Sequence, residues 1–180
     1  MLLSSLMIQT VTAINIKSIP YSESSAIVHV FSKEYGKLSL MAKGIKKSKT
    51  GNQGKLSTFF LNKYHIRSSS KSSIKTITCI ENLEIFEGLS KDYDKLKNAY
   101  EVLWLVNSVI QEDHPAPRLF TETLKALKII EHTHESEHTE TVNKFKKMIL
   151  EHEGVLNTQA KTISIDMALE KYIGKQIIKL

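Results

Sequence analysis

Short runs of alternating apolar and polar positions fill the first 80 residues, and a period of two is typical of β-strands. In residues 37–43, Leu38, Leu40 and Ala42 share one face, while lysines stand at both ends of the other. Residues 26–31 are continuously apolar, which favours a strand buried on both faces. The pattern predicts five strands, over residues 11–17, 26–31, 37–43, 58–66 and 74–80.

Five short strands separated by turn signals indicate a small β-barrel or a sandwich. The five-stranded OB-fold barrel fits this number, and so does an SH3-like barrel, so the strand count alone does not choose between them. In the first strand, Thr12, Ile14 and Ile16 are expected to face the core, with Val11 and Ala13 on the outer face. Residues 67–73 are polar and are expected to form a turn.

After residue 81 the apolar positions recur every three or four residues, as they do on one face of a helix. Ser90 or Asp92 is expected to cap the first helix, Gly154 to end the third and Ser164 to cap the fourth. Residues 132–140 are polar and acidic and are expected to form a loop. Helices are therefore predicted over residues 92–111, 118–131, 141–153 and 164–178, packed as a small bundle behind a boundary between residues 82 and 90.

The two halves of the chain carry opposite charge. Residues 1–80 hold 12 basic residues against 2 acidic ones, and residues 81–180 hold 13 against 17. Such an asymmetry suggests that the first half faces a polyanion, although lysines can also serve only to keep a domain in solution. Only Arg67 and Arg118 are arginines. Because lysine lacks the bidentate fork of arginine, we expect phosphate contacts with little sequence specificity.

Most of the candidate DNA-contacting residues lie on or beside the third predicted strand and in the glycine-, lysine- and serine-rich loop that follows it. Others come from neighbouring β elements, as do Lys17, Lys71 and Lys75. The candidates are Lys33, Lys37, Lys43, Lys46, Lys47, Lys49, Lys55, Lys63 and Arg67. Base stacking on an exposed aromatic ring would complement them, and the candidates for it, each of which could equally pack in the core, are Tyr21, Tyr35, Phe60 and Tyr64.

No catalytic constellation is recognisable, since the chain has no phosphate-binding loop, no dinucleotide turn and no nucleophile elbow. The run His132, His134 and His138 is the one feature that resembles a metal site, but it lacks a cysteine partner and an HExxH spacing. Cys79 is the single cysteine, and its side chain is expected to be buried. The lack of a partner for a disulfide suggests a reducing compartment. No secretory signal and no membrane span is expected.

The stretch YSESSAIVHVFSKEYGKLSLMAKGIKKSKTG, residues 21–51, resembles the opening of the bacterial recombination mediator RecO family. The family pattern has a tyrosine, Glu-Ser, an apolar strand, Ser-x-Glu-x-Gly-Lys, Lys-Gly and a basic run ending in serine. In this chain, residues 32–37 match the Ser-x-Glu-x-Gly-Lys element, and residues 43–48 match the Lys-Gly element and the basic run that ends in serine. LSTFFLNKYHI, residues 56–66, resembles the next β element, and residues 97–130, 143–155 and 168–180 resemble the family's helices.

The chain departs from the family after Gly154, where RecO proteins commonly carry a four-cysteine zinc-binding insertion. Here about eight residues without cysteine separate Leu156 from the last predicted helix. Zinc is therefore not carried over, and no cofactor is expected. The resemblance implies an α+β fold, with an N-terminal five-stranded OB-fold β-barrel that binds DNA in residues 1–82 and a C-terminal helical bundle in residues 83–180.

The resemblance also implies a function without enzymatic chemistry. RecO-like proteins bind single- and double-stranded DNA, anneal complementary strands coated by single-strand-binding protein, and act with RecR to help load RecA. The helical half would offer an apolar groove to the acidic C-terminal tail of single-strand-binding protein. The expected location is the cytoplasm, with the nucleoid. Two alternatives remain open: a generic OB-fold module that binds RNA or other nucleic acid, and a metal-dependent hydrolase using His132, His134 and His138.

Overall fold

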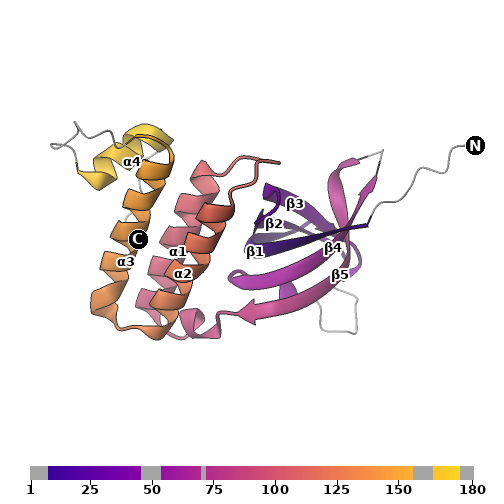
Figure 1. The fold of residues 1–180 in the computed structure, drawn as a ribbon. Coiled ribbons are helices and arrows are strands. Elements are labelled where there is room, and N and C mark those ends of the chain that lie inside the picture. The colour runs from indigo at the N-terminus through magenta and orange to yellow at the C-terminus, as the bar shows by residue number, and fades with distance from the viewer. Residues whose placement is uncertain (1–7, 46–53, 70–71, 156–163, 175–180) are drawn as a thin grey trace, which may run out of the picture. The chain divides into compact units, whose positions relative to one another are not determined.

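The computed structural model describes residues 8–45, 54–69, 72–155 and 164–174 (Figure 1). The chain divides into two compact units after Ile85. The first unit holds the strands and also takes in the segment Ile110–Pro117, and the second unit holds the helices. None of the helices within the described ranges combines the length and the apolar character that crossing a membrane requires.

The first unit is a closed barrel of five strands in the order β1-β2-β3-β5-β4. β1 pairs antiparallel with both β2 and β4, which closes the barrel, and β3 runs parallel to β5. This is the architecture of the OB-fold, so the predicted α+β class with an N-terminal OB-fold barrel is confirmed. The strands are β1 (Ile8–Pro20), β2 (Ala26–Ser32), β3 (Gly36–Ala42), β4 (Phe60–Ser69) and β5 (Ser72–Ile85).

The inner face of β1 differs from the prediction. Val11 and Ala13 are fully buried in the barrel core, whereas Thr12 is only half-buried. Ile14 is fully buried as well, so both faces of this strand are covered, and the pairing of β1 with β2 shifts register just beyond Asn15. When a strand is buried on both faces, neither face is consistently polar, so the alternation of residues does not show which face points into the barrel core. The prediction from alternation was therefore wrong for β1.

The last two strands are longer than predicted. β4 begins at Phe60 and runs to Ser69, and β5 begins at Ser72, so most of the polar segment expected as a turn is strand. Serine and threonine are tolerated on the exposed side of an antiparallel pair, and their polarity alone therefore does not mark a turn.

A polar network lies inside the barrel around Asn15, Asn62 and Tyr64, all of which are fully buried. The Tyr64 hydroxyl donates to Asn15 Oδ1 at 2.5 Å, and Asn62 Nδ2 donates to the Tyr64 hydroxyl at 3.0 Å. Both asparagine amides also donate to the Lys55 carbonyl, at 3.0 and 2.8 Å. The network thus ties the backbone at Lys55 to β1 and β4. Lys55 lies close to the point at which the described chain resumes after the lysine-rich residues 46–49.

The helical unit contains η3 (Glu87–Ser90), α1 (Tyr93–Val109), α2 (Pro117–His132), α3 (Glu135–His152) and α4 (Ile165–Ile173). The caps are as predicted. Asp92 Oδ1 accepts from the Lys95 N–H at 3.0 Å, and Ser164 Oγ accepts from the Met167 N–H at 3.2 Å. Gly154 ends α3 with φ = 69°.

The predicted loop over residues 132–140 is wrong, because α3 already begins at Glu135. Its first turn carries Glu135 and Glu137, and carboxylates there are stabilised by the partial positive charge of a helix N-terminus. His138 is 1% exposed and binds Asp94 Oδ2 on α1 through Nδ1 at 2.6 Å. A stretch that is polar by composition is therefore a packed helix start.

A buried ion-paired lysine connects three helices of this unit. Lys146 on α3 lies 2.6 Å from Glu101 on α1 and 2.9 Å from Asp166 on α4. Burial of the amine opposes its ionisation, but the hydrogen bonds to Glu101 and Asp166 prevail and raise the pKa of Lys146. Removing Glu101, the less exposed partner, would leave the buried amine with only the partly exposed Asp166 and is therefore costly.

Candidate nucleic-acid interface

The Ser-x-Glu-x-Gly-Lys motif forms the turn between β2 and β3. Ser32 Oγ accepts from the backbone N–H groups of Glu34 and Tyr35, at 3.1 and 3.2 Å. The Glu34 carboxylate accepts from the Ser32 hydroxyl and from the Thr12 N–H on β1, both at 3.0 Å. Serine and glutamate of the motif therefore hold the turn against β1, and their role is architectural.

Gly36 of the same motif allows a close approach of two backbones. Its φ is 66°, and a Cβ atom added there would lie 2.1 Å from the His114 carbonyl oxygen and 2.8 Å from that of Gln111. The next residue, Lys37, donates its N–H to the Gln111 carbonyl at 3.1 Å. The segment Ile110–Pro117 is consequently seated on the start of β3, and only glycine fits beneath it.

A cationic cluster lies on the outer face of β1, β2 and β3. Lys17 on β1 is paired with His29 on β2, and His29 is paired with Ser39 on β3. His29 Nδ1 and Ser39 Oγ are 3.0 Å apart. Burial first, and then the charges of Lys17 and Lys37, lower the pKa of His29, while Glu112 opposes them. Lys37 was among the residues predicted from the sequence, whereas His29 and Ser39 were not, although residues 37 and 39 both lie on the outward side of the alternating run.

The other described candidates lie elsewhere on the barrel. Lys63 on β4 is 3.7 Å from Glu81, which also binds His65 at 2.9 Å, so acidic charge compensates basic charge there. The hydrogen bond from His65, followed by the charge of Lys63, lowers the pKa of Glu81. Arg67 is exposed further along β4. Lys55 directs its amine to the Ile80 carbonyl at 3.2 Å.

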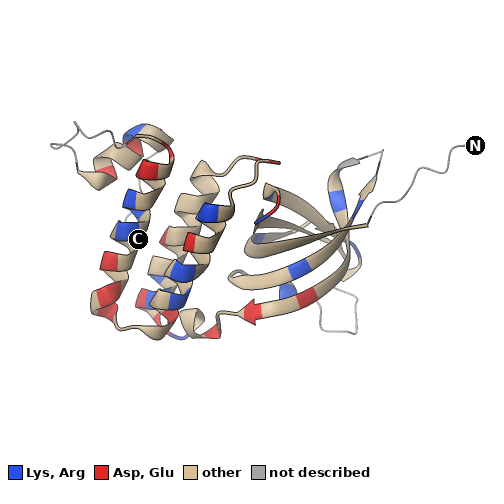
Figure 2. Ribbon diagram, in the orientation of Figure 1, with Lys and Arg blue, Asp and Glu red and all other residues tan. Residues whose placement is uncertain are grey.

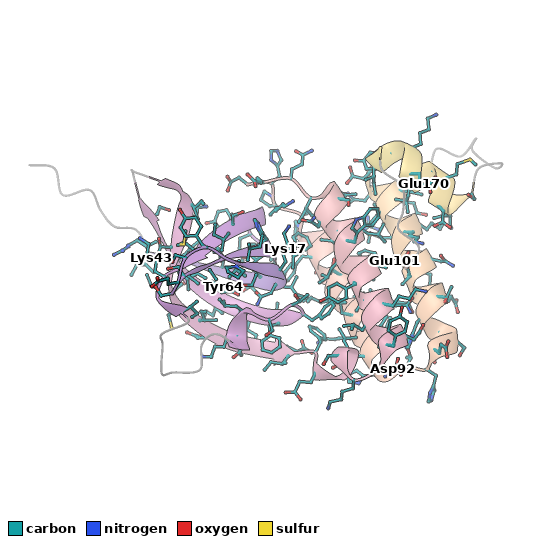
Figure 3. The ribbon with its side chains drawn as sticks, turned by 180° about the vertical axis from the view of Figure 1, so that it is seen from behind. Lys17, Lys43, Tyr64, Asp92, Glu101 and Glu170 are labelled. Atoms are coloured by element: carbon teal, nitrogen blue, oxygen red, sulfur yellow. The ribbon has the colours of Figure 1, made fainter. Side chains whose placement is uncertain are left out.

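Two lysines flank the ends of β3. Lys33 is exposed in the turn before the strand, and Lys43 is exposed directly after it. Lys43 lies just beyond the end of β3, whereas Lys17 is paired with His29 in the middle of β2, and the two are well separated in Figure 3. Figure 2 shows basic residues on several strands and few acidic ones beside them. The described candidates thus surround much of the barrel and are not confined to one strip, while Lys46, Lys47 and Lys49 lie outside the described residues.

The aromatic candidates for base stacking differ in exposure. Tyr64 is fully buried inside the barrel, where its ring packs in the core (Figure 3), so this candidate is wrong. Tyr35 packs against the core, and the Lys75 amine lies 4.8 Å from its ring centre. Phe60 is half-buried, and Tyr21, in the turn after β1, is 64% exposed. Among the described candidates, Tyr21 is therefore the ring best placed to meet a base.

Cys79 is exposed, in contrast to the prediction that it would be buried. It is paired with His65 of β4. Of the three histidines considered as metal ligands, His138 uses its ring nitrogens for Asp94 and for the Thr133 carbonyl, at 2.6 and 3.2 Å. Within the described ranges, no group of three or more potential ligand residues is arranged to hold a metal ion.

The helical unit has a groove of about 440 Å³ between α2 and α3. Its apolar lining comes from Ala126, Ile129, Phe145 and Met148. Two lysines at its rim are ion-paired within their own helices, Lys125 with Glu122 and Lys144 with Glu140, each at 2.7 Å. The groove therefore offers an apolar contact and little uncompensated positive charge.

The lowered pKa of His29 predicts an acid sensitivity of the barrel. Below about pH 6.5 the unfolded chain binds a proton at this imidazole that the folded chain does not, so stability falls as the pH falls. His29→Gln, which keeps a polar group beside Ser39, is expected to reduce the loss of Tm between pH 7 and 5. Circular dichroism melts at several pH values measure it. Exposed His132 mutated to Gln is the matched control, and equal pH profiles for both variants would contradict the prediction.

The barrel is similar in sequence to known proteins. The family model for the N-terminal part of recombination protein O matches residues 7–86. The protein named DNA repair protein RecO of Vibrio parahaemolyticus is 39% identical over 108 residues, which is 60% of this chain and 43% of that protein. Its namesake in Aliivibrio fischeri strain MJ11 is 36% identical over 110 residues, 60% of this chain and 44% of that protein.

A third relative extends the match into the helical unit. The DNA repair protein RecO of Photobacterium profundum is 30% identical over 135 residues, which is 75% of this chain and 55% of that protein. The chain thus spans about half the length of the curated relatives it matches. Since the matched residues 7–86 contain all five strands of the barrel, the barrel of this chain is similar to the N-terminal part of the RecO family.

Proposed function

We propose that this protein binds DNA through its barrel and promotes the pairing of complementary single strands during recombinational repair. The observation that carries the proposal is the coincidence of two features in one segment. Residues 1–80 hold 12 basic residues against 2 acidic ones, and they coincide with the part that the RecO family model matches. The relatives are named DNA repair proteins.

The proposed mechanism is electrostatic. Two complementary strands repel each other through their phosphates, and lysine side chains that bind both strands reduce this repulsion and release condensed counterions. Pairing then nucleates more often. Because lysine amines contact phosphates as point charges, the proposal implies little preference for base sequence. It requires no bond to be made or broken by the protein.

The proposed partners follow from the similarity to RecO proteins. We infer that RecR and single-strand-binding protein act with this chain, that RecA is loaded through their joint action, and that the protein works at the nucleoid in the cytoplasm. The groove between α2 and α3 supplies the apolar floor that a bound peptide tail needs, in particular Ile129, which is 43% exposed. Its ion-paired rim adds little attraction for an acidic tail, so this assignment depends on the family.

An annealing assay tests the proposal. Complementary single strands, bare or coated with single-strand-binding protein, are expected to pair faster with the protein than without it, and the gain should decline steeply between about 50 and 200 mM salt. Ile129→Glu is expected to reduce the gain on coated strands only. Preference for RNA without any acceleration of DNA pairing would count against the proposal and favour a general RNA-binding module.

A further inference from the structure

A hollow of about 290 Å³ opens on the outside of the barrel, beside the cationic cluster of Lys17, His29 and Lys37. It is formed by β3, by the start of β5 and by the segment Ile110–Pro117. Two lysines and two carboxylates face each other across it. The lining residues are Lys37, Leu38, Ser39, Ile74, Lys75, Glu112 and Asp113.

Lys75 is held in place at this hollow. Its side chain is 21% exposed, and its amine lies 4.8 Å from the centre of the Tyr35 ring and 3.6 Å from Asp113 Oδ1. A lysine that already has its stem packed and its amine oriented loses less conformational entropy on binding an anion than one extended into solvent. Lys75 is therefore better prepared for a ligand than the fully exposed lysines.

Asp113 is a weak partner for that amine. Its side chain is 72% exposed, so water screens the carboxylate of this pair, and another anion can replace it at small cost. Asp113 also has φ = 55°, a left-handed conformation that aspartate and asparagine tolerate better than most residues. Beside it, Glu112 forms backbone bridges with Gly36 and Lys37, which fix this segment over the start of β3.

We propose that this hollow receives a phosphodiester group of single-stranded DNA between Lys37 and Lys75, and that Asp113 occupies Lys75 until the phosphate displaces it. The Ser39 hydroxyl, whose oxygen is 3.0 Å from His29 Nδ1, supplies a further hydrogen-bonding group. From there the strand would continue over Lys17, on the same outer face. The acidic segment thus weakens DNA binding by competing for the same lysine.

The chemistry of the lining favours a phosphate over a base. Its polar groups are two amines, a hydroxyl and two carboxylates, and the Asp113 carboxylate already lies 3.6 Å from the Lys75 amine, where another anion would bind. The Tyr35 ring is covered by Lys75 and is not available for stacking. The inference depends on the proposed DNA binding and assigns a specific subsite to it.

Asp113→Asn tests the competition, because it removes the charge and keeps a residue that tolerates the backbone conformation. The variant is expected to bind a single-stranded oligonucleotide about two- to fivefold more tightly at about 50 mM salt. This factor corresponds to the free energy that a surface ion pair typically contributes. Because the same phosphate contact forms in both proteins, the logarithmic salt slope should change little in Asp113→Asn, whereas the loss of Lys75 should flatten it by about 0.7, the value for one phosphate contact on a single strand. Lys75→Met, which keeps an apolar stem on Tyr35, should weaken binding by a similar factor.

Controls separate the subsite from net charge and from the function itself. Glu151→Gln changes the net charge equally, in a helix of the other unit and outside the groove between α2 and α3, and should leave affinity unchanged. In the Lys75→Met background, Asp113→Asn should lose its effect. Equal gains from Asp113→Asn and Glu151→Gln, or a gain that persists without Lys75, would overturn the subsite while DNA binding by the parent protein stands. A parent protein that binds no DNA would overturn both.

Discussion

Reversing Lys43, Lys46 and Lys47 to glutamate is expected to remove most of the affinity for single-stranded DNA at moderate salt, a loss on the order of a hundredfold or more. Lys43 is exposed directly after β3, and the other two follow within the segment that lies outside the described residues. Each lysine that neutralises a phosphate contributes about 0.7 to the logarithmic salt slope on a single strand, so losing three contacts should flatten the slope by about 2. Repulsion by the new carboxylates adds to the loss.

Fluorescence anisotropy with a labelled oligonucleotide, at several salt concentrations, measures both quantities. A matched control applies the same charge change to the helical unit, where Lys125, Lys144 and Lys147 are exposed and ion-paired within their helices. This control is expected to lose far less affinity. If both triple variants lost affinity equally, net charge alone would explain the binding, and the barrel would have no special role.

Gly36→Ala is expected to destabilise the barrel by about 2–3 kcal/mol, from two contributions. An L-residue in the left-handed region costs about 1–2 kcal/mol. The added methyl group would also meet the His114 carbonyl oxygen at 2.1 Å, so the segment Ile110–Pro117 must move. Its hydrogen bond from the Lys37 N–H to the Gln111 carbonyl would then break, which costs about a further 1 kcal/mol.

Gly44 offers a matched control for this substitution. Its φ is 65°, almost the same as that of Gly36, but nothing lies within 4 Å of an added Cβ atom. Gly44→Ala should therefore show the conformational cost alone. Urea denaturation followed by circular dichroism gives the difference in unfolding free energy, and hydrogen exchange of the Lys37 amide reports whether the contact is lost. Equal losses of stability in the two variants, with the amide still protected, would show that the close approach costs nothing.

The elements with a strong local pattern were predicted well. Apolar residues recur every two residues in the strand half and every three or four residues in the helical half, and this difference separated the two halves. Asp92, Ser164 and Gly154 mark helix ends, because capping depends on neighbours within one turn. Alternation in residues 37–43 likewise placed Leu38 and Leu40 inside, as the structure confirms. These features require no information from distant parts of the chain.

Residues whose environment is set by distant segments were predicted poorly. Tyr64 is buried in the barrel core, where its hydroxyl donates a hydrogen bond to Asn15, 49 positions away. His138, expected in a solvated loop, is buried against Asp94, 44 positions away. Lys63 loses part of its electrostatic attraction for phosphate to Glu81 on the adjacent strand, a pairing that depends on the register of β4 and β5. Composition and periodicity contain none of these distances.

The sequence alone determined the order of the strands and helices, the helix caps and the excess of lysine in the first half. Propensity, periodicity and charge are local or additive properties, so they can be read without the tertiary structure. Only the tertiary structure decided which of the lysines meet carboxylates, that Gly36 supports the segment Ile110–Pro117, and that Asp113 approaches Lys75. The physical reason is that closing the barrel and seating that segment on β3 bring together residues far apart along the chain, and electrostatic and steric interactions depend on distance in space.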